Sequence, residues 1–171
     1  CNPEEIIFTS SGSESNNMVL KGTLSSGDHF ITSSYEHPAI LKVLPYLEDN
    51  EIECSLVQPD RNGLVQPESV EREIRENTRL ISIMYVNNEL GTINSISEVA
   101  QLSHEKGILF HSDAVQALGK ISLNMNDIPA DFLSMSAHKI YGPKGVGALY
   151  LRIKEPRIHL QPIMFGGGHE R

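Results

Sequence analysis

The feature that most constrains the fold of this chain is a regular alternation of short apolar runs with amphipathic helical patterns. Seven runs have the composition of strands, at residues 5–9, 29–32, 53–57, 80–86, 108–111, 131–135 and 147–151. The run at 80–86 is apolar on both faces, which is typical of a strand buried in a parallel sheet. Strands that alternate with helices predict βαβ units, so we expect an α/β fold whose mostly parallel central sheet is flanked by helices.

Local signals indicate where the helices lie. Helical patterns follow most of the runs, at 13–24, 38–48, 67–75 and from 95 to about 106. Ser95 and Glu98 have the spacing of a capping box, and Gly107 suits the residue just past that helix. Pro38 fits a first helical turn, whereas Pro45 does not fit a helix interior, so we expect a kink or a loosened turn there. The absence of repeats and linkers in this sequence predicts one domain over residues 1–171.

The composition limits the kinds of binding partner and the cellular compartment that we expect. The 171 residues carry a formal net charge of -8, which argues against a nucleic acid or an anionic membrane as partner. No apolar run reaches the roughly 20 residues that a membrane helix needs. Cys1 and Cys54 are too few for a disulfide scaffold, and no CxxC occurs for a zinc ribbon. We therefore expect a reducing, cytoplasmic setting.

Polar clusters follow several of the predicted strands, and ligands of open α/β sheets bind at that edge. The segment Thr9–Asn17 places small residues between a strand and a helix. There the Gly12 N–H and the Ser13 hydroxyl could bind a phosphate at the positive end of the helix dipole. An ordinary serine N-cap would explain the same residues. The segment is not a Walker loop, because no Gly-Lys-Ser/Thr follows it.

Two further strand ends carry titratable residues. His37 precedes Pro38 and suits either a capping role or a catalytic one. His111 and Asp113 share a strand face, and apolar neighbours predict that Asp113 is a buried carboxylate that needs a cationic partner. Gln116 follows three residues later. The His-x-Asp pair also fits an iron-binding facial triad, but that triad usually lies on an all-β barrel with a distal histidine, so we expect no metal.

The run Ser134–Gly145 is the most specific in the chain, because a strand is followed within a few residues by serine, histidine and lysine and then by a Gly-Pro-Lys-Gly turn. A lysine at such a strand end can form a Schiff base if burial or a nearby cation depresses its pKa. A surface lysine in a turn is the alternative interpretation of Lys139.

Taken together, these residues resemble the NifS/IscS-type cysteine desulfurases, within the class V aminotransferase-like pyridoxal-phosphate (PLP) enzymes. The resemblance covers all 171 residues and rests on Thr9–Asn17, Glu36-His37, Asn87–Glu89, Asp113–Gln116, Ser136–Lys139 and Gly166–Arg171. It implies the three-layer αβα large domain of the fold-type-I PLP enzymes. It also implies conversion of L-cysteine to L-alanine with transfer of sulfur to an enzyme cysteine persulfide, for iron–sulfur cluster or other sulfur-cofactor biosynthesis. Another class V activity, a selenocysteine lyase or an aminotransferase, stays open.

The resemblance also implies a role for each matching residue. Lys139 holds PLP covalently, His37 stacks on the ring and helps to move protons, and Asp113 pairs with the pyridinium nitrogen. Gln116 contacts the phenolic oxygen of the ring, and Asn88 lies near that oxygen and the substrate carboxylate. The phosphate is held by Gly12, Ser13, Ser136 and His138.

The chain departs from the family pattern in places. Ser10–Ser13 stands where family members usually read Ser-Gly-Ala-Thr, and Ala137 stands where many have glycine. Both ends look like cuts in a longer polypeptide, so we expect a partial large domain without the N-terminal segment and the C-terminal small domain. The resemblance places the nucleophilic cysteine and the substrate-binding arginine beyond Arg171. We therefore expect that neither Cys1 nor Cys54 accepts sulfur and that the fragment alone is an inactive cofactor-binding module. A homodimer and a sulfur-acceptor or scaffold protein are the implied partners.

Overall fold

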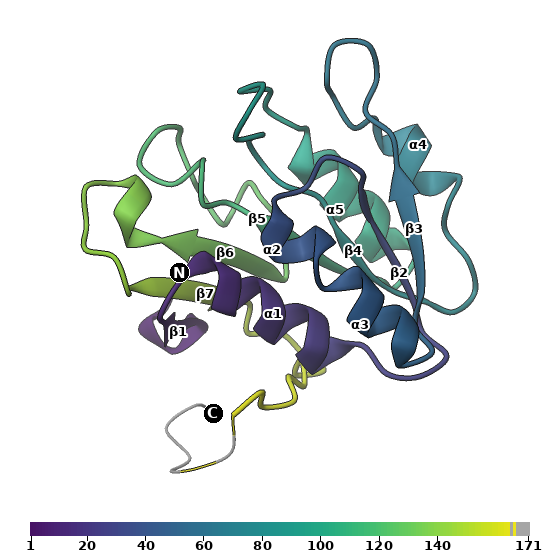
Figure 1. Cartoon of the computed structure of the whole chain (residues 1–171), viewed down its shortest axis with the longest axis horizontal. Coiled ribbons are helices and arrows are strands. Elements are labelled where there is room, and N and C mark those ends of the chain that lie inside the picture. The colour runs from purple at the N-terminus through teal and green to yellow at the C-terminus, as the bar shows by residue number, and fades with distance from the viewer. Residues whose placement is uncertain (165, 167–171) are drawn as a thin grey trace.

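A seven-stranded sheet organises residues 1–164 and 166, the part of the chain that the structure, a computed structural model, describes. The strands are β1 (Ile6–Thr9), β2 (His29–Ser33), β3 (Glu53–Val57), β4 (Thr78–Ser82), β5 (Leu109–Asp113), β6 (Phe132–Ser136) and β7 (Gly147–Leu151). Their order is β1-β7-β6-β5-β4-β2-β3 (Figure 1). The pairings from β3 to β6 are parallel, whereas β7 runs antiparallel to both β6 and β1. The predicted mostly parallel sheet is confirmed.

Helices cover both faces of this sheet. The helices are α1 (Gly12–Thr23), α2 (Pro38–Leu41), α3 (Leu44–Asp49), α4 (Pro67–Glu71) and α5 (Ile96–Glu105), with short 3-10 helices η1 (Pro3–Glu5) and η2 (Ala137–Lys139). The first three pack on one face, and α4 and α5 pack on the other. The architecture is therefore the predicted three-layer αβα arrangement. Within the described residues, no helix is long and apolar enough to cross a membrane.

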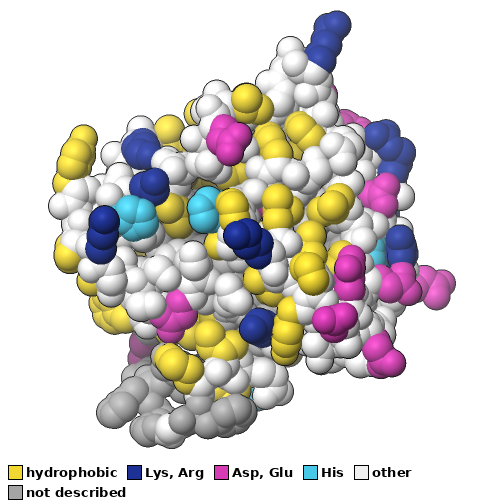
Figure 2. All heavy atoms as spheres, in the orientation of Figure 1, with side chains coloured by type: hydrophobic (Ala, Val, Ile, Leu, Met, Phe, Trp, Pro, Cys, Tyr) yellow, Lys and Arg dark blue, Asp and Glu magenta, His cyan; other side chains and the backbone are white. Residues whose placement is uncertain are grey.

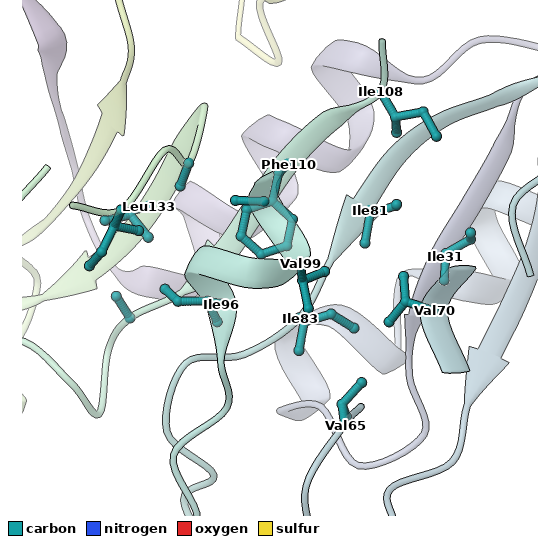
Figure 3. Close-up of a cluster of buried hydrophobic side chains, with 14 of the residues drawn as sticks. Ile31, Val65, Val70, Ile81, Ile83, Ile96, Val99, Ile108, Phe110 and Leu133 are labelled. Atoms are coloured by element: carbon teal, nitrogen blue, oxygen red, sulfur yellow. The ribbon is translucent and has the colours of Figure 1, made fainter. Parts of the chain in front are cut away.

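Two apolar clusters, one on each face, explain why several strands are apolar throughout. Neighbouring residues of a strand point to opposite faces, so Phe30 joins the cluster under α1 and Ile31 joins the cluster under α5. Leu80 and Ile81 divide in the same way. Figure 3 shows the α5-side cluster, in which Ile31 and Ile81 of the sheet lie beneath helical side chains such as Val99.

The strands lie within one or two residues of their predicted bounds, except for one that differs more in its extent. The structure begins β4 at Thr78 and ends it at Ser82, whereas the apolar run predicted 80–86. The residues after Ser82 still follow β5, because the backbone N–H groups of Ile83 and Tyr85 donate to the carbonyls of His111 and Asp113. The apolar pattern thus reports burial between two helical layers more than it reports regular strand geometry.

The helix boundaries also differ from the sequence prediction. Pro45 lies in the first turn of α3, so the predicted 38–48 helix is broken into α2 and α3 instead of being kinked. The capping-box prediction at Ser95 is wrong, since its backbone is not extended and its side chain does not cap α5. Helix α4 ends at Glu71, four residues earlier than predicted. Gly107 has a φ of +71° just past α5, and that prediction is confirmed.

Candidate active site

The start of α1 and the segments that follow β2, β4, β5 and β6 surround a cavity of about 210 Å³. All nine residues predicted from the sequence line it: Gly12, Ser13, His37, Asn88, Asp113, Gln116, Ser136, His138 and Lys139. Five further residues that sequence reasoning did not assign also line it: Ser11, Asn16, Ala39, Met84 and Val115. The fold therefore brings the predicted residues together, and their individual roles remain predictions.

One part of the cavity is built from groups that suit an anion. Ser11 is the N-cap of α1, and its hydroxyl accepts a hydrogen bond from the Glu14 N–H at 3.1 Å. The first backbone bond of the helix is donated by Ser15, so the N–H groups of Gly12 and Ser13 precede it. The Ser11 cap and the Ser13 hydroxyl occupy different positions of the turn, so capping and anion binding are compatible.

A second wall of this part comes from the end of β6. The Ser136 hydroxyl and Nδ1 of His138 are hydrogen-bonded at 2.8 Å. Gly12 brings the start of α1 close to this wall, because a Cβ at that position would lie 3.7 Å from Cβ of Ser136, and no larger residue fits there, since the same Cβ would lie 2.5 Å from Cγ2 of Val115 after β5. The helix terminus, two hydroxyls and a histidine thus line one cavity, as a phosphate site requires.

Basic groups also gather on the surface. Figure 2 shows histidine side chains beside lysine or arginine side chains left of the centre of this face, while most visible acidic side chains lie toward the lower right. His37, His138 and Lys139 are exposed residues that line the cavity. The overall charge of -8 therefore does not prevent a local basic environment around the site.

Asp113 is the buried anionic group of the cavity, with 5% of its surface exposed. Its Oδ2 accepts from Nδ2 of Asn16 at 2.8 Å, and its Oδ1 accepts from the N–H of Val115 at 2.9 Å. Burial raises the pKa of Asp113, although these two bonds and the charge of His37 act in the opposite direction. Within the described residues Asp113 forms no ion pair. The predicted burial is confirmed, and a cationic group that enters the cavity would meet this carboxylate.

His37 and Lys139 are the candidate proton-transfer groups. Nδ1 of His37 accepts from the N–H of Ala39 at 3.1 Å and caps α2, so the neutral ring carries its proton on Nε2. The capping alternative is therefore correct, and it leaves Nε2 available for catalysis. Lys139 ends η2 and is exposed. Burial is one of the two conditions named above for Schiff-base formation by this lysine, and the structure does not meet it.

Two amide side chains complete the predicted set. Oε1 of Gln116 accepts a hydrogen bond from Nζ of Lys120. Asn88 is exposed, and its loop is ordered by its neighbour Asn87, whose Oδ1 accepts from the N–H groups of Glu89 and Leu90 at 2.9 and 2.8 Å. The loop holds Asn88 at the cavity through the buried Asn87, a residue of the predicted motif to which no role of its own was assigned.

His111 has a structural environment. Its Nδ1 is bonded to the Ser82 hydroxyl at 2.8 Å and its Nε2 to the Ser134 hydroxyl at 2.9 Å. Burial lowers the pKa of His111 to about 3, so the ring is neutral. Because both ring nitrogens already have partners, this geometry does not favour the facial-triad alternative. Within residues 1–164 and 166, no cluster of three or more metal-binding side chains is present.

The two cysteines lie outside the cavity lining. Cys54 is half-buried in β3, and burial raises the pKa of its thiol to about 11, which disfavours the reactive thiolate. Cys1 is exposed before the first strand. The predicted Gly166–Arg171 motif lies outside the described residues except for Gly166.

Comparison with known proteins identifies the family. Residues 1–171 match the aminotransferase class-V family over their whole length. The chain belongs to the class-V aminotransferase family. It is 47% identical over 173 residues to the cysteine desulfurase IscS of Stutzerimonas stutzeri (strain A1501), an alignment that covers 99% of this chain and 43% of that protein. The chain thus spans less than half the length of such relatives.

Solved structures of this class-V family share the fold. A structure described as SspA in complex with cysteine superposes with a TM-score of 0.92 and 41% identity, over 99% of this chain and 50% of that one. DndA from Streptomyces lividans superposes with a TM-score of 0.90 and 40% identity, over 100% of this chain and 50% of that one. The resemblance to the cysteine desulfurases and the fold that it implied are confirmed.

Proposed function

We propose that this chain is the cofactor-binding part of a PLP-dependent cysteine desulfurase, which converts L-cysteine to L-alanine and transfers sulfur to an enzyme cysteine as a persulfide. The observation that carries the proposal is the convergence of nine predicted residues on one cavity around the buried Asp113. The names of the relatives support a desulfurase over a selenocysteine lyase or an aminotransferase. One of the superposing structures was determined with cysteine bound.

The residues present fit PLP at both of its charged positions. Gly12, Ser13, Ser136 and His138 would hold the phosphate through N–H, hydroxyl and imidazole groups. Asp113 would face the ring nitrogen and keep it protonated, which supplies the cation that this buried carboxylate lacks among the described residues.

The remaining side chains have complementary tasks in this proposal. PLP, when bound, supplies an electron sink for the electrons of a bond broken at the substrate α-carbon. Lys139 would hold the cofactor covalently and, once its amine is released, would carry protons. His37 would exchange a proton at Nε2. Gln116 and Asn88 would donate hydrogen bonds to cofactor or substrate oxygens from the cavity wall.

The wider setting is part of the same proposal. The substrate would be L-cysteine, the complete protein would be a cytoplasmic homodimer, and a sulfur-acceptor or scaffold protein would receive the persulfide sulfur for iron–sulfur cluster or related biosynthesis. The names and the titles of the relatives support the activity and the substrate class. Neither Cys1 nor Cys54 lines the cavity, so we place the sulfur-accepting cysteine elsewhere in the complete protein.

The test is a covalent map of the cofactor. The complete protein is loaded with PLP, reduced with borohydride, digested and analysed by mass spectrometry. We expect a pyridoxyl group on Lys139, and we expect Lys139→Ala to lose both this adduct and the visible absorbance of the bound cofactor. Lys144 lies in the same exposed turn but not in the cavity lining, so Lys144→Ala is the matched control and should keep both signals. An adduct on Lys144 would overturn the assignment.

A further inference from the structure

Glu36 is a buried carboxyl group that the proposed reaction does not use. It lies between β2 and α2, directly before His37, and only 3% of its surface is exposed. Its Oε1 accepts hydrogen bonds from the Ser33 hydroxyl at 2.6 Å and from the N–H of Met84 at 2.8 Å. Its side chain therefore connects the end of β2 with the segment after β4, and two of the residues that it holds in place, His37 and Met84, line the cavity.

The two oxygens of Glu36 have unequal surroundings. Both hydrogen bonds reach Oε1, whereas Oε2 is buried and has no hydrogen-bond partner among the described residues. An ionised carboxylate with one oxygen in this position would be poorly solvated. A protonated carboxyl group is the less costly state here, because Oε1 still accepts both hydrogen bonds and the unpaired Oε2 carries a neutral hydroxyl group in place of negative charge.

Asp113 shows the opposite arrangement. Each of its oxygens accepts one hydrogen bond, from the Asn16 side chain and from the Val115 N–H. Donors on both oxygens stabilise a carboxylate anion. The hydrogen bonds therefore distinguish the two buried carboxyl groups, one arranged as an acid and the other as an anion.

The charges around Glu36 support the same distinction. Burial raises the pKa of Glu36 to about 8, and the negative charge of Asp113 acts in the same direction, against the bonds from Ser33 and Met84. His37 is the basic group whose charge acts on Asp113. Two carboxyl groups that interact in a buried region do not ionise together easily, and burial raises the pKa of Asp113 as well, so it is the hydrogen bonds that favour the proton on Glu36.

We propose that Glu36 is a neutral carboxylic acid that positions His37 and Met84 at the cavity and leaves Asp113 as the anionic partner of a cationic ligand. Its protonation is a property of this chain alone, whereas its importance for PLP rests on the proposed function. A cationic ring nitrogen would then face one negative charge in place of two, and the carboxylate that it faces would be the one with donors on both oxygens.

The protonation is tested without the cofactor, in the complete protein. Infrared spectra of the wild type and of Glu36→Gln are compared at pH 7. The wild type should show the carbonyl stretch of a protonated carboxylic acid, and this band should be lost in Glu36→Gln. Glu105→Gln removes an exposed carboxyl group on the other face of the sheet and should leave the band unchanged. A band that survives in Glu36→Gln, or that is absent from the wild type, would overturn the proposal.

Proton linkage gives a second measure of the same state. The folded protein keeps a proton that unfolded Glu36 loses, so the unfolding equilibrium constant should rise by up to about tenfold per pH unit between the ordinary carboxyl pKa and about 8. Glu36→Gln should remove this factor, and Glu105→Gln should retain it. Equal pH dependence in wild type and Glu36→Gln would contradict a neutral Glu36.

The positioning role is tested by comparing two substitutions. Glutamine imitates a neutral acid with an acceptor and a donor, so Glu36→Gln should keep PLP affinity within about twofold and the pH profile of its visible absorbance. Glu36→Ala removes both contacts and should weaken PLP binding by about tenfold or more. Equal losses in the two variants would exclude a neutral positioning acid. If Lys139 carries no cofactor, the proposed function fails, while the infrared band still decides the protonation of Glu36.

Discussion

Asp113 and Asp131 are buried aspartates at opposite ends of two neighbouring parallel strands, and they differ in their hydrogen-bond partners and in the direction in which their pKa is shifted. Asp131 lies just before β6 and accepts hydrogen bonds from His104 at 3.1 Å, from Lys154 at 2.6 Å and from the Phe110 N–H at 2.8 Å. Burial alone would raise the pKa of Asp131, but the bonds from His104 and Lys154 outweigh it and lower the pKa. Asp113 ends β5, and there burial prevails and raises the pKa.

This difference separates a structural carboxylate from one that is prepared for a ligand. Asp131 is paired with Lys154 and hydrogen-bonded to His104 and the Phe110 N–H, and these contacts connect the start of β6 with the segment after β7, with α5 and with β5. Asp113 obtains only the neutral donors of Asn16 and Val115, and it opens onto the cavity. The comparison agrees with the general placement of ligands at the carboxyl ends of parallel strands.

The largest expected effect follows from removing the charge of Asp113. In the complete protein, Asp113→Asn should slow alanine formation from L-cysteine by about 10²–10³-fold, because a neutral amide no longer keeps the ring nitrogen protonated. The cofactor-free variant should be at least as stable as the wild type, since a buried charge without a cationic partner has been removed. Rates near those of the wild type at equal PLP occupancy would rule out this role.

Asp131→Asn should lower stability and leave turnover nearly unchanged, the reverse of Asp113→Asn. We expect a loss of about 2 kcal/mol of unfolding free energy, because Lys154 and the His104 ring lose a charged acceptor, and little change in turnover per folded molecule. Asp127→Asn changes an exposed aspartate in the preceding loop and is the matched control. Urea unfolding of the three proteins measures the difference, and a wild-type midpoint in Asp131→Asn would show that the ion pairs contribute nothing.

The pH dependence of these stabilities has opposite signs at the two sites. The folded pKa of Asp131 is lowered, so its contribution is present above the ordinary carboxyl pKa and is lost as the pH falls through the folded value. The folded pKa of Asp113 is raised, so ionisation destabilises the fold as the pH rises from the ordinary value to the folded one. Asp131→Asn should therefore converge with the wild type at acidic pH, and Asp113→Asn should diverge from it as the pH increases.

The layers of this fold could be predicted from the sequence because hydrophobic periodicity reports burial directly. The run at 80–86, predicted to be apolar on both faces, is such a pattern, because Leu80 and Ile81 lie in the two opposite clusters. Exact helix ends could not be predicted, because they depend on local dihedral angles. Ser95 has the composition of a cap, yet its backbone conformation does not permit one.

The site was predictable where a residue belongs to a local motif, as Lys139 and Ser136 do. The resemblance marked the residues that would meet the cofactor in the proposed function, but it did not reveal the contacts that support them. Asn16 reaches Asp113 across 97 positions of the sequence, and Glu36 reaches Met84 across 48. Such contacts depend on the packing of α1 against β5 and on the pairing of β2 with β4, for which no local pattern exists.

The smallest expected effect concerns Cys54 on the edge strand β3, which tests whether the part of the sheet away from the cavity is structural, as Asp131 suggests. Cys54 is half-buried in β3, and its Sγ donates weakly to the Ile52 carbonyl at 3.8 Å. With a pKa raised by burial to about 11, on the order of one thiol in ten thousand is ionised at neutral pH, and the thiolate is the reactive form.

Cys54→Ala should therefore leave sulfide release from L-cysteine, measured with dithiothreitol in the complete protein, within about twofold of the wild type. Cys1→Ala is the matched control, because that thiol is exposed and also lies outside the cavity lining. A loss of more than tenfold in Cys54→Ala at unchanged stability would make Cys54 the sulfur acceptor. Such a result would place sulfur chemistry on β3, where burial disfavours ionisation of the thiol. It would also contradict the distinction between a reactive site at the carboxyl ends of the strands and structural residues elsewhere in the sheet.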